Sequence, residues 1–261
     1  MRRRIIAVLT SLALGTGVAV ASLLAGPAQE AFACSQFFHV TDSNGLDQVE
    51  NSNNFNGGVL CINNTGGTSN LTVHPGNGNL SQDQVHSYPN IKYGCGFPPD
   101  SFCTTGSPFP KQVSSLGNLT TRWIIDRSGV SAASKYDSAL DLFFSPTSAH
   151  TTVSSEVMVW ANRNLNPIPP GAVDVTINSI TYHRFVVHQT RSNFSWDEVI
   201  YARFPMVDSF NTLNIKPILD NAVSAGLGLT NSMYSIDFSC GLEAYNNGDH
   251  WAETDCRVTN F

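Results

Sequence analysis

The chain has 261 residues, of which 41% are hydrophobic, 10% aromatic and only 13% charged. The usual charged share is about 25%, so the composition excludes a disordered polyelectrolyte and a coiled coil, both of which need many charges. The net charge of −6 argues against a nucleic-acid partner, because phosphates repel an acidic surface. Abundant Asn, Ser, Thr and Gly favour turns and strand surfaces over helices, which predicts a β-rich fold.

Residues 1–33 have the organisation of a secretory signal peptide. Three arginines precede an apolar stretch over residues 5–24, and an Ala-Phe-Ala triplet with the form of a cleavage site ends at Ala33. A cut after Ala28 and a retained membrane anchor are the alternatives. We expect a secreted, extracellular protein whose mature part, residues 34–261, is one domain that does not associate with the membrane.

All six cysteines lie in the expected mature part. An even number in an exported chain predicts three disulfides, although the spacing alone permits many pairings. Short loops favour Cys95–Cys103 and Cys240–Cys256, which leaves Cys34–Cys61. The sequence has no C-x-x-C or H-x-x-x-H spacing, so we expect no metal site. The absence of a G-x-S-x-G sequence weakens a serine-hydrolase interpretation.

Short segments of alternating apolar and polar residues, separated by turn residues, predict a series of strands. Residues 62–80 and 94–118 are rich in Gly, Pro, Asn and Ser, and they are predicted to be mostly loops. The predicted strands that follow are residues 123–125, 140–144, 157–160, 173–177, 180–188 and 198–204.

One helix is predicted after these strands, over residues 215–223, because its apolar residues recur at helical spacing. Pro217 would occupy the first turn, where proline is tolerated. Asn211 or Thr212 could cap its start, and Gly226 could end it. The whole pattern predicts an all-β sandwich of two packed antiparallel sheets with one helix.

Residues 155–162 place unusual side chains on alternate positions of a predicted strand. Successive side chains of a strand point to opposite faces, so Val157 and Val159 would enter the core. The opposite face then carries Glu156, Met158, Trp160 and Asn162. An indole can stack on a sugar ring and an amide can bind its hydroxyls, so this face fits the wall of a sugar-binding groove. Ordinary solvent-facing side chains would give the same alternation.

Two further carboxyl groups follow this pattern. Asp141 and Phe143 alternate with apolar residues in one predicted strand, and Glu243 and Tyr245 alternate with apolar residues in another. Partial burial beside aromatic surface raises the pKa of a carboxyl group, which keeps it protonated as a general acid requires. A single Glu in a strand is also common at an exposed edge.

Together these segments resemble glycoside hydrolase family 12, a family of compact endoglucanases with a β-jelly-roll fold. Residues 156–163 and the Pro-x-Pro-Pro-Gly that follows resemble the family's E-[IV]-M-[IV]-W-x-N segment and its turn. Ser87-Tyr88-Pro89 is similar to an S-Y-P element, and residues 139–146 resemble S-Y-D-[IL]-[WF] with its proline. Residues 241–248 are similar to G-x-E-x-[WF]-x-G. The resemblance covers the chain from about Cys34 to its end.

The resemblance implies a role for each carboxyl group. Glu156 would be the nucleophile and Glu243 the acid/base, while Asp141 would hydrogen-bond Glu156 from a neighbouring strand. Retaining cleavage of a β-glycoside needs two such carboxyl groups about 5–5.5 Å apart. Because Glu156 and Asp141 would titrate as a coupled pair, we expect an acid-to-neutral pH optimum.

The resemblance further implies an open substrate cleft on the jelly roll, acting on a β-glucan without any cofactor. The residues expected to bind the substrate are Phe55, Tyr88, Phe143, Met158, Trp160, Asn162 and Tyr245. Phe55 stands beside the position at which the family has a sugar-stacking Trp, so it either takes over the stacking or leaves that subsite weaker. We expect a monomer.

Three alternatives stay open on the sequence. Xyloglucan could be the preferred chain, since the family includes both specificities. A glycan-binding or wall-loosening protein on the same fold could have lost turnover, although the three carboxyl groups argue against it. A purely structural secreted sandwich would leave the clustering of polar and aromatic residues on one face unexplained.

Overall fold

The structure is a computed structural model of the chain. It describes residues 32–35, 38–41, 45–52, 58–63, 71–78, 84–98, 102–165, 168–190, 194–246 and 250–261. Within these ranges the chain forms two β-sheets and one α-helix, together with a single turn of 3₁₀-helix at Val113–Ser115. Phe55 and most of the predicted signal segment lie outside the described residues.

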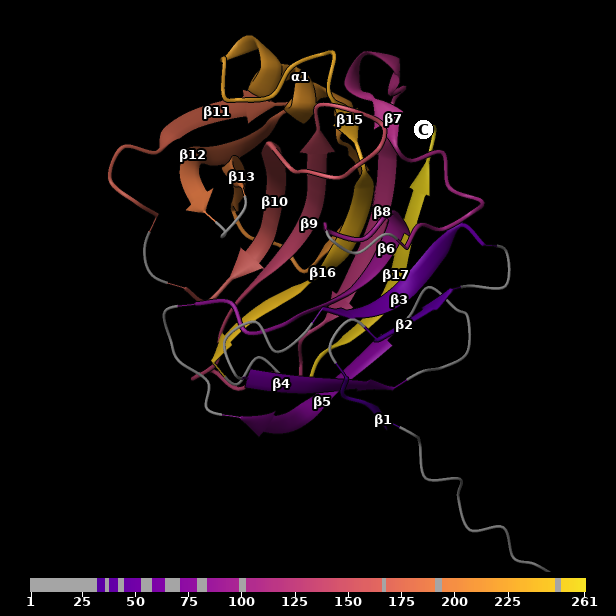
Figure 1. Cartoon of the computed structure of the whole chain (residues 1–261). Coiled ribbons are helices and arrows are strands. Elements are labelled where there is room, and N and C mark those ends of the chain that lie inside the picture. The colour runs from indigo at the N-terminus through magenta and orange to yellow at the C-terminus, as the bar shows by residue number, and fades with distance from the viewer. Residues whose placement is uncertain are drawn as a thin grey trace, which may run out of the picture.

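The smaller sheet has six strands in the order β1-β4-β5-β17-β8-β14 (Figure 1). Its strands are β1 (Phe32–Ala33), β4 (Gly58–Asn63), β5 (Leu71–Gly78), β17 (Ala252–Thr259), β8 (Thr120–Asp126) and β14 (Ser209–Asn214). Residues 62–80 were predicted to be mostly loop, and this was wrong for β5, which pairs with both β4 and β17. Its backbone hydrogen bonds to distant strands override the turn-forming composition that guided the prediction.

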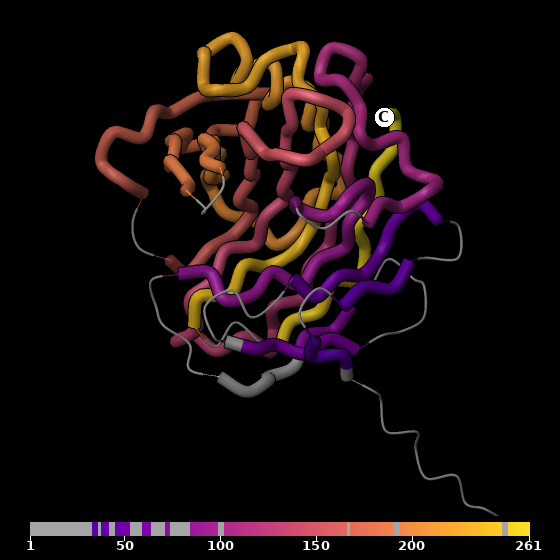
Figure 2. The backbone as a smooth tube through the Cα atoms, in the orientation of Figure 1, coloured from indigo at the N-terminus to yellow at the C-terminus, as the bar shows by residue number. Residues whose placement is uncertain are grey.

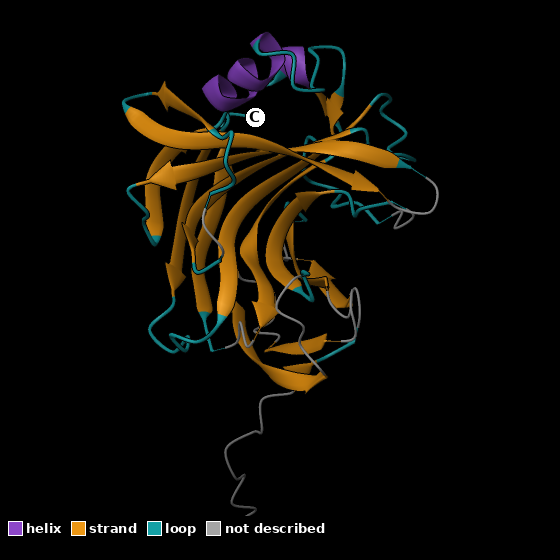
Figure 3. Cartoon of the chain, turned by 90° about the vertical axis from the view of Figure 1, so that its left-hand side faces the viewer, coloured by secondary structure: helices purple, strands orange, loops and turns teal. Residues whose placement is uncertain are grey.

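The larger sheet has eleven strands, nine of them in the order β11-β12-β13-β10-β9-β16-β6-β3-β2. These are β11 (Val173–Ile177), β12 (Ile180–Thr190), β13 (Ser195–Phe204), β10 (Ser155–Arg163), β9 (Lys135–Ser145), β16 (Asp237–Asn246), β6 (Tyr88–Gly94), β3 (Asp47–Ser52) and β2 (Phe38–Thr41). The short strand β15 (Tyr234–Ser235) pairs with β9, and β7 (Lys111–Gln112) pairs with β15. Figure 3 shows that this sheet is strongly curved. The pair β10–β13 is parallel, which departs from the expected purely antiparallel sheets.

The predicted strands from residue 123 to residue 204 are all present. β11 and β12 form the expected hairpin, whose turn residues Asn178 and Ser179 both have positive φ. Segments far apart in the sequence lie side by side, since β16 near the C-terminus is inserted between β9 and β6, as the yellow and magenta tubes of Figure 2 show.

The helix α1 (Lys216–Ser224) lies where the sequence predicts it, at one end of the sandwich (Figure 3). Pro217 is in its first turn, and Gly226 follows its end with a φ of +67°. The predicted capping residues were wrong, because the backbone of residues 209–214 is held in β14. Asn214 accepts the Lys216 backbone N–H at 3.1 Å instead.

The main core lies between the two sheets. It takes the apolar alternate positions of both, including Trp123 from β8 and Leu140 and Val157 from the larger sheet. Trp123 and Trp251 are both fully buried in this core. The residues that lie between these core positions in the larger sheet therefore face away from the smaller sheet.

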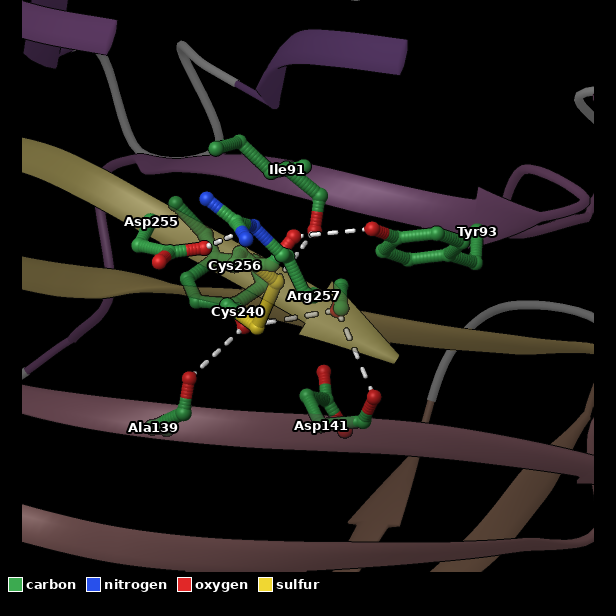
Figure 4. Close-up of a disulfide and its surroundings, with 10 residues drawn as sticks. Ile91, Tyr93, Ala139, Asp141, Cys240, Asp255, Cys256 and Arg257 are labelled. Atoms are coloured by element: carbon green, nitrogen blue, oxygen red, sulfur yellow. Dashed lines mark hydrogen bonds and ion pairs between the residues drawn. A yellow bond between two sulfur atoms is a disulfide. The ribbon is translucent and has the colours of Figure 1, made fainter. Parts of the chain in front are cut away.

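All three predicted disulfides are present: Cys34–Cys61, Cys95–Cys103 and Cys240–Cys256. The third joins β16 of the larger sheet to β17 of the smaller one through the core (Figure 4). Next to it, the Tyr93 hydroxyl donates a hydrogen bond to the Cys256 carbonyl at 2.8 Å. The covalent link fixes the strand that carries Glu243 against the opposite sheet.

The N-terminal end of the described chain pairs with the smaller sheet. Phe32 and Ala33 lie opposite Asn63 and Ile62 in β1–β4, and the Ala33 carbonyl accepts a hydrogen bond from Asn51. A cut after Ala28 would keep this pairing, whereas a cut after Ala33 would remove it. Among the described residues, no helix is both long and apolar enough to span a membrane.

Glu253 on β17 is a carboxyl group buried completely within the sandwich. Burial raises its pKa well above the usual range, the Trp123 indole partly offsets this rise, and the charge of Asp47 adds to it. The folded protein therefore keeps Glu253 protonated at pH values at which the unfolded chain ionises it. Its contribution to stability is full below the unfolded pKa of about 4.3 and is lost as the pH rises above that value.

We expect Glu253→Gln to remove this pH-dependent loss, because an amide does not ionise. The melting temperature of the variant minus that of the wild type should increase by about 3–8 °C between pH 4 and pH 8. Thermal unfolding followed by circular dichroism measures this difference. Asp220→Asn, at an exposed carboxyl group on α1, is the control, and it should show no such increase. A difference for Glu253→Gln that stays constant with pH would contradict a raised pKa.

Candidate active site

Five carboxyl groups project from four adjacent strands of the larger sheet, on the face away from the main core. They are Asp137 and Asp141 on β9, Glu156 on β10, Glu198 on β13 and Glu243 on β16. Each alternates with residues of the core, so the two-residue period of the strands places them on one face. The grouping of Asp141, Glu156 and Glu243 follows the sequence prediction.

Glu156 is 5% exposed and is held from the neighbouring strand β13. The Trp196 indole N–H donates a hydrogen bond to its Oε2 at 2.5 Å. Burial raises the pKa of Glu156 well above the usual range, and the charges of Asp141 and Glu198 raise it further, while the Trp196 bond lowers it. The carboxyl group is thus fixed in orientation with one oxygen bonded to the protein.

Asp141 lies one strand away from Glu156, opposite Met158 in the β9–β10 ladder. Burial raises the pKa of Asp141 well above its usual range, the charges of Asp237 and Glu243 add to the rise, and a hydrogen bond with Glu156 lowers it. Since two carboxylates only accept hydrogen bonds, Asp141 and Glu156 need a shared proton to form this bond. We therefore expect the two groups to titrate as a pair, as the family resemblance implies.

Glu243 is only partly buried, in contrast to Glu156. The Tyr245 hydroxyl donates a hydrogen bond to its Oε2 at 3.3 Å. Burial raises the pKa of Glu243 to about 7, although hydrogen bonds from Asp137 and Tyr245 act to lower it. Near neutral pH this group can therefore both give and take a proton, as an acid/base requires.

Asp137 pairs directly with Glu243 across β9 and β16. It is fully buried, and burial together with the Glu243 charge raises its pKa well above the usual range. A protonated Asp137 can donate a hydrogen bond to Glu243, which favours the ionised form of Glu243. Asp137 thus opposes the effect of burial on its neighbour.

A buried ion-pair network lies beside these carboxyl groups, on the strands β3, β6 and β16. Lys92 on β6 contacts Glu50 on β3 at 3.0 Å, and its ammonium lies 3.9 Å from Asp237 on β16. The Asp237 carboxylate also accepts the Phe143 backbone N–H at 2.8 Å. The Lys92 ammonium balances part of the negative charge on this face of the larger sheet, because buried charges require partners.

Tyr88, expected to bind substrate, lies over β16 on the face of the carboxyl groups. Its hydroxyl donates to the Ala139 carbonyl at 3.1 Å and lies 3.3 Å from Ser239 Oγ. Gly241 makes this possible, because a Cβ there would come within 2.7 Å of the Tyr88 ring and 2.5 Å of the Pro89 carbonyl oxygen. The glycine of the G-x-E sequence is therefore required by the close approach of β6.

The apolar residues expected at the substrate lie in two smaller clusters on this face. Met158 and Trp160 pack in one, where the Trp160 and Phe185 rings meet edge to face at 5.5 Å. Phe143 belongs to the other cluster and meets the Phe97 ring edge to face at 4.8 Å. Figure 1 shows the strands that carry these residues side by side in the larger sheet.

Asn162 is placed differently from the other members of its strand. The β9–β10 ladder shifts register between Trp160 and Asn162, which breaks the two-residue alternation. The Asn162 side chain donates a hydrogen bond at 2.7 Å to Asp208, which also binds Arg127. The prediction that Asn162 shares the face of Glu156 assumed uninterrupted alternation along the strand. Because of the bulge, that alternation does not extend to Asn162.

Sequence reasoning missed three groups of the site. Asp137 and Glu198 are carboxyl groups that became recognisable only once the strands beside Glu156 and Glu243 were known. The third is Trp196, whose indole N–H donates a hydrogen bond to Glu156. A signal did exist for Glu198, because the positions that alternate with it on the same side of the predicted strand are the apolar residues Ile200, Ala202 and Phe204.

Two clusters of described residues bring cysteine together with other potential metal ligands. One is Cys95, Cys103 and His150, and the other is Cys240, Glu253 and Cys256. In both the cysteines form disulfides, so their sulfur atoms are not available as thiolate ligands. The carboxyl groups of the candidate active site belong to neither cluster.

A known protein family matches most of the chain. The sequence profile of glycosyl hydrolase family 12 matches residues 52–261. The chain belongs to this family. It is therefore a glycoside hydrolase of the cellulase type, with the β-jelly-roll fold. No match was found among curated protein sequences.

Solved structures of the family have the same fold. A metagenome-derived glycoside hydrolase family 12 endoglucanase superposes with a TM-score of 0.76 at 24% identity, over 88% of this chain and 97% of the other. The endoglucanase Cel12A of Rhodothermus marinus gives 0.73 at 24%, over 88% and 98%. A family 12 xyloglucanase of Bacillus licheniformis gives 0.73 at 19%, over 88% and 99%.

Proposed function

We propose that this family 12 protein is a retaining endo-β-1,4-glucanase that cuts internal bonds of cellulose-like or mixed-linkage glucans. The observation that carries the proposal is the different environment of two carboxyl groups on one face. Glu156 is buried and held by Trp196, whereas Glu243 is partly exposed and has a pKa of about 7. Such a division suits a nucleophile and an acid/base.

In the first step, ionised Glu156 attacks the anomeric carbon while Glu243 gives its proton to the leaving glycosidic oxygen. The glycosidic bond breaks and a glycosyl ester of Glu156 forms. In the second step, Glu243 takes a proton from a water molecule, whose oxygen attacks the same carbon and releases Glu156. Asp141 stays beside Glu156 in both steps. It holds the shared proton while Glu156 is ionised, and it can release that proton when Glu156 is esterified and carries no charge.

We also propose that the enzyme acts outside the cell as a monomer. Three disulfides form and persist in oxidising surroundings, and the N-terminal segment has the sequence pattern of a signal peptide. Fractionation of a culture that expresses the whole chain, followed by mass spectrometry of the N-terminus, tests the export and locates the cut.

Hydrolysis of barley β-glucan, carboxymethyl-cellulose and xyloglucan tests the proposed activity. We expect viscosity to fall well before most reducing ends appear, because an endo-acting enzyme shortens chains from within. Proton NMR at early times should show the β-anomer of the new reducing end. An α-anomer at first would contradict retention, and a higher kcat/KM on xyloglucan than on the two other glucans would assign that specificity instead.

A further inference from the structure

Glu198 is the direct neighbour of the proposed nucleophile. The parallel pairing of β10 with β13 sets Glu198 opposite Glu156, so both side chains project from the same face of the sheet. Its own strand places Val199 and Tyr201 in the core on the other face. Glu198 is 7% exposed and forms no ion pair with the described residues, which is unusual for a carboxylate.

One oxygen of the Glu198 carboxyl group is bonded to the protein. Gln189 on β12 donates its side-chain N–H to Oε2 at 2.5 Å. Among the described residues, this is the one hydrogen bond that the Glu198 side chain makes. Oε1 accepts no hydrogen bond from the described residues and is not one of their fully buried unbonded oxygens, so a ligand can reach it.

The titratable groups on the same face of the sheet as Glu198 are mostly acidic. They are Glu156 on β10, Asp137 and Asp141 on β9, and Glu243 and Tyr245 on β16. Burial raises the pKa of Glu198 to about 8, the charge of Glu243 adds to the rise, and the Gln189 bond lowers it. Below that pH the group is a neutral acid, which can donate a hydrogen bond without repelling ionised Glu156.

We propose that Glu198 binds the substrate, with its free oxygen holding a hydroxyl of the sugar ring that Glu156 attacks. Neighbouring strands lie about 4.8 Å apart, so a ring whose anomeric carbon meets Glu156 can extend over the adjacent side chain. Trp196, which binds Glu156, also projects from β13. One strand thus positions both the nucleophile and the ring. The proposal rests on the proposed glucanase function and adds a specificity-determining residue to it.

The experiment compares Glu198→Ala and Glu198→Gln with a control on the same strand. Asp197→Asn is that control, because Asp197 is exposed and lies on the opposite face, where it pairs with His188. On barley β-glucan at pH 6 we expect E198A to lose about 10–100-fold in kcat/KM, since a buried hydroxyl contact disappears. E198Q should recover part of that loss, because its amide still donates a hydrogen bond.

A binding measurement separates substrate contact from a change in chemistry or folding. In the Glu156→Gln background, calorimetry with cellotetraose should show weaker binding when E198A is added, while the melting temperature stays close to that of the parent. Raising the pH from 6 to 9 should weaken binding to E156Q more than to E156Q/E198Q, because the amide does not ionise.

The outcomes distinguish this inference from the proposed function. If the wild type cuts glucans and E198A behaves like D197N in both kinetics and binding, the inference is wrong and the proposed function stands. If the wild type releases no reducing ends from any glucan, the proposed function fails, and the inference fails with it.

Discussion

Glu156→Gln should reduce kcat on barley β-glucan by at least about a thousandfold. An amide cannot attack the anomeric carbon, so no glycosyl ester forms, yet its carbonyl oxygen can still accept the Trp196 hydrogen bond. The shape of the site is thereby kept, and cellotetraose should bind with an affinity within a few-fold of the wild type. Reducing-end release and calorimetry measure the two quantities.

Asp220→Asn is a suitable control for this loss, because it also converts one carboxyl group into an amide, on the surface of α1. It should hydrolyse β-glucan like the wild type. Activity of E156Q within tenfold of the wild type would show that Glu156 is not the nucleophile. Asp141 would then be the next group to test, since it projects beside Glu156 from the neighbouring strand β9.

Glu243→Ala should lower kcat on glucans by about 10²–10⁴-fold, because the leaving oxygen receives no proton in the first step. An aryl glucoside with a good leaving group does not need that proton, so Glu243→Ala should slow the first step much less with this substrate. Added azide can replace water in the second step and needs no general base. We therefore expect azide to restore turnover of the aryl substrate, with a β-glycosyl azide as the product.

The pH profile gives a second readout for Glu243. The group must be protonated in the first step, so wild-type activity should fall as the pH rises through about 7, the value to which burial raises its pKa. Glu243→Ala should lose this decline when an aryl substrate is used. A wild-type optimum above pH 8, or no azide product, would count against Glu243 as the acid/base.

The strand period made most of the catalytic face predictable. Glu156, Met158 and Trp160 share a face because side chains alternate along β10, and the same rule places Glu243 on β16. The alternation failed at Asn162, where a bulge that no local residue signals turns the side chain toward Asp208. A bulge arises from pairing with a partner strand, and the sequence of one strand does not contain it.

The disulfides illustrate a different limit. Loop lengths favoured Cys95–Cys103 and Cys240–Cys256 without deciding among the possible pairings, and the structure has these two bonds together with Cys34–Cys61. That the Cys240–Cys256 bond joins the two sheets behind Glu243 could not be deduced, because it depends on β16 and β17 belonging to different sheets.

The sequence by itself determined a β-rich chain with one helix, three disulfides, and the strands that carry Asp141, Glu156 and Glu243. These features depend on local periodicity, on spacing and on short motifs, which are properties of neighbouring residues. Only the tertiary structure decided that β13 lies beside β10, and with it that Trp196 and Glu198 adjoin the proposed nucleophile. Strand order follows from contacts between distant segments, whose free energy depends on how two surfaces pack and not on either sequence alone.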